Sequence, residues 1–239
     1  MRLFGTDPLL YLILLVGLAF SMFIGFVTQQ RFLMPVASAL ILWPMLIWSL
    51  RHARIDVAVR LVAFWAVVIF VVTIIASRVL GARAQETVPG GLEYIANQML
   101  WLTGRESTVE GVSNWLPELA RRTGLVLAGG AVSAGLLPLI AAARWLAILG
   151  LWTANLFNAA HPLLAVPLSI SPWTWAEFVA QAALLIVMAE PIVTGNVHGL
   201  LTRDRSRLLL TGLIALFLAI AFHLLLPGLL ASPLRALVL

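Results

Sequence analysis

Apolar segments about as long as a bilayer is thick fill most of this 239-residue chain. Hydrophobic residues make up 62% of it and charged residues only 10%, whereas a soluble domain carries roughly 25% charged residues. About 20 apolar residues suffice to cross a bilayer core of about 30 Å. The sequence therefore predicts an all-α polytopic membrane helix bundle, with residues 1–239 forming one integral membrane domain.

Seven segments have the length and apolarity of transmembrane helices. The predicted spans are residues 8–27, 32–50, 57–80, 122–143, 145–166, 172–195 and 208–226. Arg144 separates the fourth and fifth spans, so we expect it in a tight turn. In the fourth span small residues recur four positions apart, which is typical of close helix packing in lipid.

The loop over residues 81–120 is polar but has helical periodicity. Apolar residues recur from Leu92 to Leu100, with Glu93 and Asn97 on the opposite face, and a second periodic stretch follows. We expect two short amphipathic helices lying on the outer membrane surface. The alternative is that they form a lid over a cavity between the spans.

All fifteen cationic residues are arginines, and their distribution predicts the orientation of the chain. With the N-terminus inside and the C-terminus and the 81–120 loop outside, eight arginines fall on the inner side: Arg2, Arg51, Arg54, Arg60, Arg144, Arg203, Arg205 and Arg207. We expect the cytoplasmic (inner) membrane of a bacterium or archaeon. Because topology and lipid headgroups explain these arginines, the net charge of +5 does not indicate a nucleic-acid partner.

The composition excludes some chemistry. The chain has no lysine, so a retinal-type Schiff base is ruled out, and no cysteine, so thiol nucleophiles and cysteine-ligated metals are ruled out. The sequence also lacks a nucleotide-binding loop, so any ATP dependence would require an energising partner.

Polar side chains inside the spans are costly and are therefore candidates for function. They concentrate in the predicted fifth and sixth spans, where they would line a polar path: Asn155, Asn158, His161, Glu177, Gln181 and Glu190. For Glu190, which precedes Pro191, the alternative is a structural role: an ion pair with Arg144 or Arg203, or a hydrogen bond to Asn155.

Two histidines and a carboxylate form a second candidate site. His161 and His223 are predicted at a similar depth near the outer face, close to Glu177. Such a set can bind a divalent metal, the histidines alone could hold haem, and the same groups could relay protons. Helix-to-helix hydrogen bonding is the structural alternative, and the sequence favours no resident cofactor.

The leading functional prediction is a non-enzymatic, multi-pass inner-membrane protein. It would be a transport component, or a membrane subunit of a larger complex, that moves a small solute, ion or lipid. Its partners would be the lipid bilayer and other membrane subunits or an energising protein. The alternatives are a haem- or metal-binding membrane protein of respiratory or cofactor-assembly type and a structural scaffold subunit.

Overall fold

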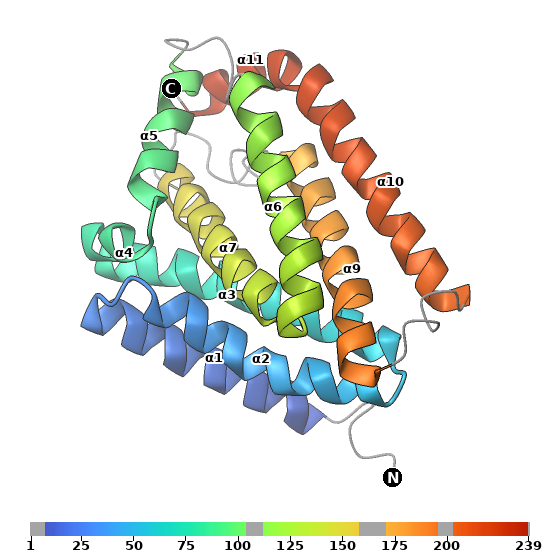
Figure 1. The fold of residues 1–239 in the computed structure, drawn as a ribbon. Helices are drawn as coiled ribbons and strands as arrows, with labels where there is room; N and C mark the ends of the chain where they lie inside the picture. The colour runs from blue at the N-terminus through green and yellow to red at the C-terminus, as the bar shows by residue number, and fades with distance from the viewer. Residues whose placement is uncertain (1–7, 104–111, 158–170, 196–202, 239) are drawn as a thin grey trace.

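The computed structural model describes residues 8–103, 112–157, 171–195 and 203–238, which are helical and contain no strand (Figure 1). The long helices are α1 (Pro8–Thr28), α2 (Leu33–Arg51), α3 (Ile55–Leu80), α6 (Val112–Ser133), α7 (Leu136–Leu156), α9 (Pro172–Thr194) and α10 (Arg203–Leu225). The shorter helices are α4 (Ala82–Thr87), α5 (Gly91–Leu102) and α11 (Pro227–Val238).

Six helices in the described part of the chain are long and apolar enough to cross a membrane: α1, α2, α3, α7, α9 and α10. The predicted helical membrane bundle is thereby confirmed, but the predicted number of seven spans is not. The helix missing from the six is α6, which corresponds to the predicted fourth span. Its first half carries three charged residues, Glu118, Arg121 and Arg122. The two termini lie on opposite sides of the membrane only if α6 makes a seventh crossing, so the predicted orientation stays a prediction.

The predicted boundary between the fourth and fifth spans is wrong. α6 ends at Ser133, and a turn of two residues, Ala134 and Gly135, leads into α7 with positive φ values of 50° and 89°. The Ser133 hydroxyl, at the end of α6, accepts a hydrogen bond from the Leu137 N–H in the first turn of α7 at 3.0 Å. Arg144 consequently lies inside α7 rather than in a turn.

The loop over residues 81–120 also differs from the prediction. α5 occupies the position of the first amphipathic helix. The second does not form a separate element in the described residues, because the chain from Val112 onward belongs to α6. The apolar periodicity was real, but it continues directly into the longer helix.

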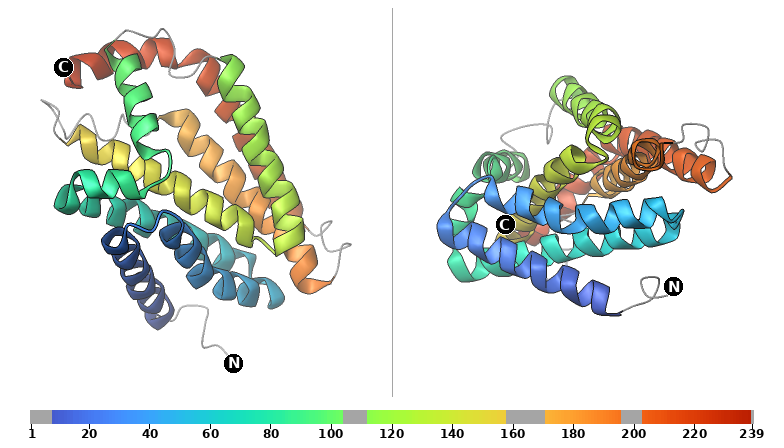
Figure 2. Two further views of the ribbon diagram at one scale, coloured as in Figure 1. Left: turned by 60° about the vertical axis from the view of Figure 1, so that its left-hand side comes forward. Right: turned by 60° about the horizontal axis from the view of Figure 1, so that its bottom comes forward.

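The helices are arranged in two groups (Figures 1 and 2). α1, α2 and α3 pack against one another, and α7 lies across α2 and α3. α6 packs against both α7 and α9, α9 also contacts α2 and α3, and α10 covers the far side of α9. Leu14, Leu46, Trp65 and Leu139 are fully buried in one shared apolar core, while outward-facing apolar side chains such as Phe217 suit a lipid environment.

Close backbone approaches hold this arrangement. A Cβ at Gly130 of α6 would lie 3.0 Å from the Cβ of Met188 on α9. A Cβ at Gly150 of α7 would lie 2.8 Å from the Cβ of Thr73 on α3. Small residues let helix backbones come this close in lipid, where apolar side chains gain nothing by leaving the solvent.

Candidate functional site: an arginine-lined cavity

The described members of the predicted polar path lie in three separate places. Gln181 donates a hydrogen bond to Glu177 at 2.8 Å, as their spacing of four predicts. Asn155 instead lies near the end of α7, where its side chain accepts a hydrogen bond from Gln85 of α4 at 3.4 Å. Glu190 lies towards the opposite end of α9. Asn158 and His161 are outside the described residues.

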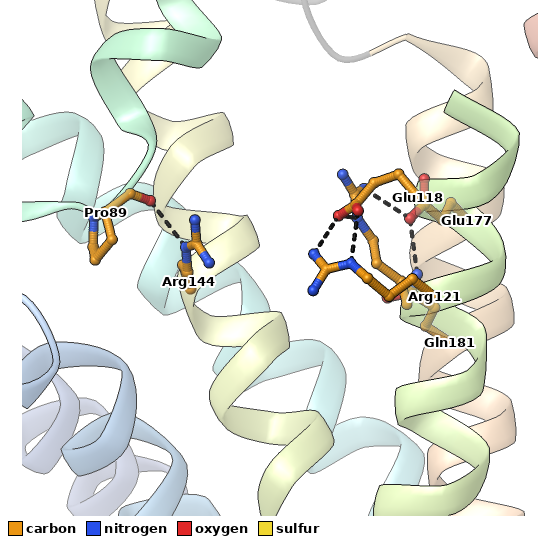
Figure 3. Close-up of polar contacts among 7 residues, drawn as sticks. Pro89, Glu118, Arg121, Arg144, Glu177 and Gln181 are labelled. Atoms are coloured by element: carbon orange, nitrogen blue, oxygen red, sulfur yellow. Dashed lines mark hydrogen bonds and ion pairs between the residues drawn. The ribbon is translucent and has the colours of Figure 1, made fainter. Parts of the chain in front are cut away.

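A charged network joins α6 to α9 next to Gln181 (Figure 3). Arg122 donates to the buried Glu177 at 3.1 Å and to Glu118 at 3.0 Å. Arg121 donates to both carboxylate oxygens of Glu118, at 2.7 and 2.8 Å. Each carboxylate is therefore held by at least one guanidinium group, the geometry that makes such pairs strong.

Glu118 is the centre of this network and lies in α6, outside the six apolar helices. The pKa of Glu118 falls from its ordinary 4.5 to about 2, mainly because Arg121 hydrogen-bonds to the carboxylate; Arg122 adds to the effect and partial burial opposes it. The same contact raises the pKa of Arg121. The carboxylate is thus ionised at neutral pH and fixes both guanidinium groups in place.

Arg144 is the residue that sequence analysis misplaced. It follows eight residues after the start of α7, about 12 Å along the helix. Its Nε donates to the carbonyl of Pro89, at the turn before α5, at 2.9 Å, and its side chain is exposed. Among the described residues it forms no ion pair with a carboxylate, in contrast to Arg121 and Arg122.

These side chains surround a cavity of about 370 Å³, which we call the arginine cavity. Figure 3 shows Arg144 on α7 and Arg121 on α6 on opposite sides of it. Three guanidinium groups and one carboxylate line it, so positive charge is in excess. The lining residues are Glu118, Arg121, Arg122, Leu125, Val126, Pro138, Ala141, Arg144, Trp145, Ile148 and Gln181.

A second lobe of about 350 Å³ shares five of these lining residues and extends towards α5. Glu93 and Asn97, on the polar face of α5, line this lobe. α5 therefore forms one wall of this lobe, while its alternative role as a lid stays a prediction. On another wall Trp145 lies 3.9 Å below the Arg122 guanidinium, a cation–π contact.

The histidine and carboxylate set is only partly described. His223 is buried, stacked on Trp115 with ring centroids 3.8 Å apart and an interplanar angle of 4°. It shares a small cavity of about 20 Å³ with Glu177, room for one water molecule. The described residues contain no cluster of three potential metal-ligating His, Cys, Asp or Glu side chains. With His161 outside the described residues, the predicted ligand set stays a prediction.

Glu190 forms a buried ion pair with Arg205, which joins α9 to α10. The side chains are 2% and 12% exposed. The expected structural alternative named Arg144 or Arg203 as the partner. The kind of contact was therefore anticipated, but the partner was not, because three arginines, Arg203, Arg205 and Arg207, lie close together at the start of α10.

The turn at Ala134 and Gly135 carried a signal that hydropathy hides. Gly135 followed by Pro138 matches a glycine that ends one helix and a proline in the first turn of the next. Recognising it would have moved both predicted helices about ten residues towards the N-terminus. Arg144 would then have fallen inside a membrane helix, the strongest default indication of function.

Searches of protein-family models, curated proteins and solved structures find no match to this chain. The fold defines it as a multi-pass helical membrane protein.

Proposed function

We propose that this protein binds an anionic group in the arginine cavity and is part of a system that moves a small anionic solute, ion or lipid across or within the membrane. The observation that carries the proposal is Arg144, a charged side chain inside an apolar helix that faces a cavity of about 370 Å³.

The energetics support a binding role for Arg144. A charged arginine at the centre of a membrane helix costs about 2.5–3.5 kcal/mol on insertion scales, and such residues mark ion and substrate pathways. Its one described hydrogen bond, to the Pro89 carbonyl, leaves the other guanidinium donors for a ligand. An arginine with spare donors beside a water-accessible cavity favours carboxylate, phosphate or sulfate groups.

The charges around Arg144 point the same way. Glu118 pairs with Arg121 and Arg122, and Glu177 pairs with Arg122. Neither carboxylate therefore neutralises Arg144. The proposal keeps the predicted location in a bacterial or archaeal inner membrane and the predicted partner subunits. It replaces the predicted path through Asn155 and Glu190 with the arginine cavity, of which Gln181 is a part.

Binding is tested by thermal unfolding of the purified protein in a neutral detergent. Inorganic phosphate, sulfate and phosphatidylglycerol are added separately. A ligand that binds the folded state stabilises it in proportion to the logarithm of its concentration above Kd. We expect at least one of the three to raise Tm, and Arg144→Gln to abolish the increase. Stabilisation by none of them, or equal stabilisation of the variant, would refute the proposal.

Arg60→Gln is the matched control. Arg60 is also an arginine within an apolar helix, α3. Its side chain is 54% exposed and pairs with Asp56, and it does not line the cavity. It should leave the anion-dependent increase in Tm unchanged. Movement is then measured in proteoliposomes with the stabilising anion, where Arg144→Gln should slow the protein-dependent flux about tenfold or more.

A further inference from the structure

The arginine cavity opens at the surface beside an apolar stripe on α6. Arg121, Leu125, Ala128 and Val132 follow one another at spacings of four, three and four residues, so they share one face of the helix. All four are exposed. Arg121 and Leu125 also line the cavity, so the stripe begins inside the cavity and continues along the outside of α6.

The stripe has the length of one lipid tail region. Arg121 and Val132 are eleven residues apart, about 16 Å at about 1.5 Å per residue. Half of a hydrocarbon core about 30 Å thick is about 15 Å. A charged group at one end and apolar side chains over the next 16 Å match the division of a lipid into headgroup and acyl chain.

The cavity itself is amphipathic. Arg144 and Arg121 face it from opposite walls, and Leu125, Val126 and Ile148 complete the lining with apolar surface. A free inorganic anion would use the guanidinium groups but leave this apolar surface and the second lobe of about 350 Å³ unfilled. Ligand sites generally match the size and polarity of what they hold.

We infer that the arginine cavity binds the anionic headgroup of a lipid, held between Arg144 and Arg121, with an acyl chain along the Leu125–Val132 stripe of α6. This inference rests on the proposed function and names its ligand class, a lipid with a phosphate-bearing headgroup. Free phosphate shares the headgroup chemistry, so the test must separate the two sources.

The test is native mass spectrometry of the full chain in neutral detergent, titrated separately with phosphatidylglycerol and phosphatidylcholine. Binding of inorganic phosphate is followed by its effect on Tm. Phosphatidylglycerol should bind at least about tenfold more tightly than the zwitterionic lipid, and Arg144→Gln should remove this preference, since a charge-assisted hydrogen bond is lost.

Val132→Gln separates the tail from the headgroup, because Val132 belongs to the stripe, is 80% exposed and does not line the cavity. We expect it to weaken phosphatidylglycerol binding several-fold while leaving the effect of inorganic phosphate unchanged. Leu127→Gln is the control: Leu127 is 37% exposed on the same helix, outside the stripe and the cavity lining. Because both substitutions place the same amide on an exposed helix position, a general loss of folding would affect both, and the unfolding curves of all variants report it.

The outcomes separate the two levels of the argument. Arg144-dependent stabilisation by phosphate, together with equal binding of the two lipids, would overturn the lipid inference and leave anion binding standing. Absence of any Arg144-dependent effect would overturn both. Equal weakening of lipid binding by Val132→Gln and Leu127→Gln would overturn the placement of the acyl chain.

Discussion

The buried ion pair between Glu190 of α9 and Arg205 of α10 makes a quantitative prediction about how α10 is held. Arg205→Met keeps most of the side-chain volume but removes the positive charge. It leaves the Glu190 carboxylate, 2% exposed, without its partner. Isolating one charge of a buried pair in this way is far more costly than exchanging the whole pair for apolar or neutral groups.

The magnitude follows from comparing two ion pairs in the same protein. The Glu190 and Arg205 side chains are 2% and 12% exposed, so losing Arg205 should lower the free energy of unfolding by about 3–5 kcal/mol. Arg60 and Asp56 on α3 are 54% and 69% exposed, and breaking an exposed helical pair of this kind costs only about 0.2–1 kcal/mol. The double variant Glu190→Gln/Arg205→Met should recover most of the loss.

The assay is reversible unfolding in mixed micelles of neutral detergent and sodium dodecyl sulfate, followed by tryptophan fluorescence. A double-mutant cycle over Glu190 and Arg205 gives the interaction energy directly, and Arg60→Met is the control. The reasoning is refuted if Arg205→Met and Arg60→Met destabilise the protein equally, or if the double variant is no more stable than Arg205→Met.

Three further predictions concern the packing and charge around the cavity. Glu118 should make the protein more stable than the Glu118→Gln variant above pH 4.5, and this advantage should be lost as the pH falls towards 2, because the folded pKa of Glu118, about 2, lies below its ordinary value. The Tm of both proteins between pH 7 and 3 measures the advantage, and a difference in Tm that does not change with pH contradicts the prediction. Gly150→Ala should cost about 1–3 kcal/mol because its Cβ would lie 2.8 Å from that of Thr73, whereas Gly124→Ala, with open space around it, should be neutral or gain up to about 1 kcal/mol in the same unfolding assay. Ser133→Ala removes the acceptor of the Leu137 N–H in the first turn of α7 and should cost about 0.5–1.5 kcal/mol; hydrogen exchange at that turn should increase, and unchanged exchange there would argue against this role of Ser133.

Several local features followed from the sequence because neighbouring residues determine them. α1, α2, α3 and α9 lie within about two residues of their predicted positions, since each is a long apolar run bounded by polar or proline residues. The contact between Glu177 and Gln181 follows from their spacing on one helix. The structural alternative for Glu190, an ion pair with an arginine, agrees with the observed contact in kind but not in partner.

The arginine cavity did not follow in the same way. The sequence places Arg121 and Arg122 at the junction of the 81–120 loop and the predicted fourth span, and Arg144 in a predicted turn, and arginines at helix ends and in loops are the common case in membrane proteins. The two-residue turn at Ala134 and Gly135 overrides that expectation. It shifts α6 and α7 along the chain, so that Arg144 lies within a helix and lines a cavity instead of marking a loop.

The sequence by itself determined the solvent in which this chain folds and the helical form it takes there. A run of about 20 apolar residues is stable in a bilayer only if its backbone hydrogen bonds are satisfied within the helix. Tertiary structure alone decided which polar groups meet: Arg122 joins Glu118 to Glu177, Arg205 joins Glu190, and Arg144 faces Arg121 across a cavity. Hydropathy reports the depth of a residue in the membrane, whereas these pairings depend on the rotation and register of each helix against its neighbours, which only packing sets.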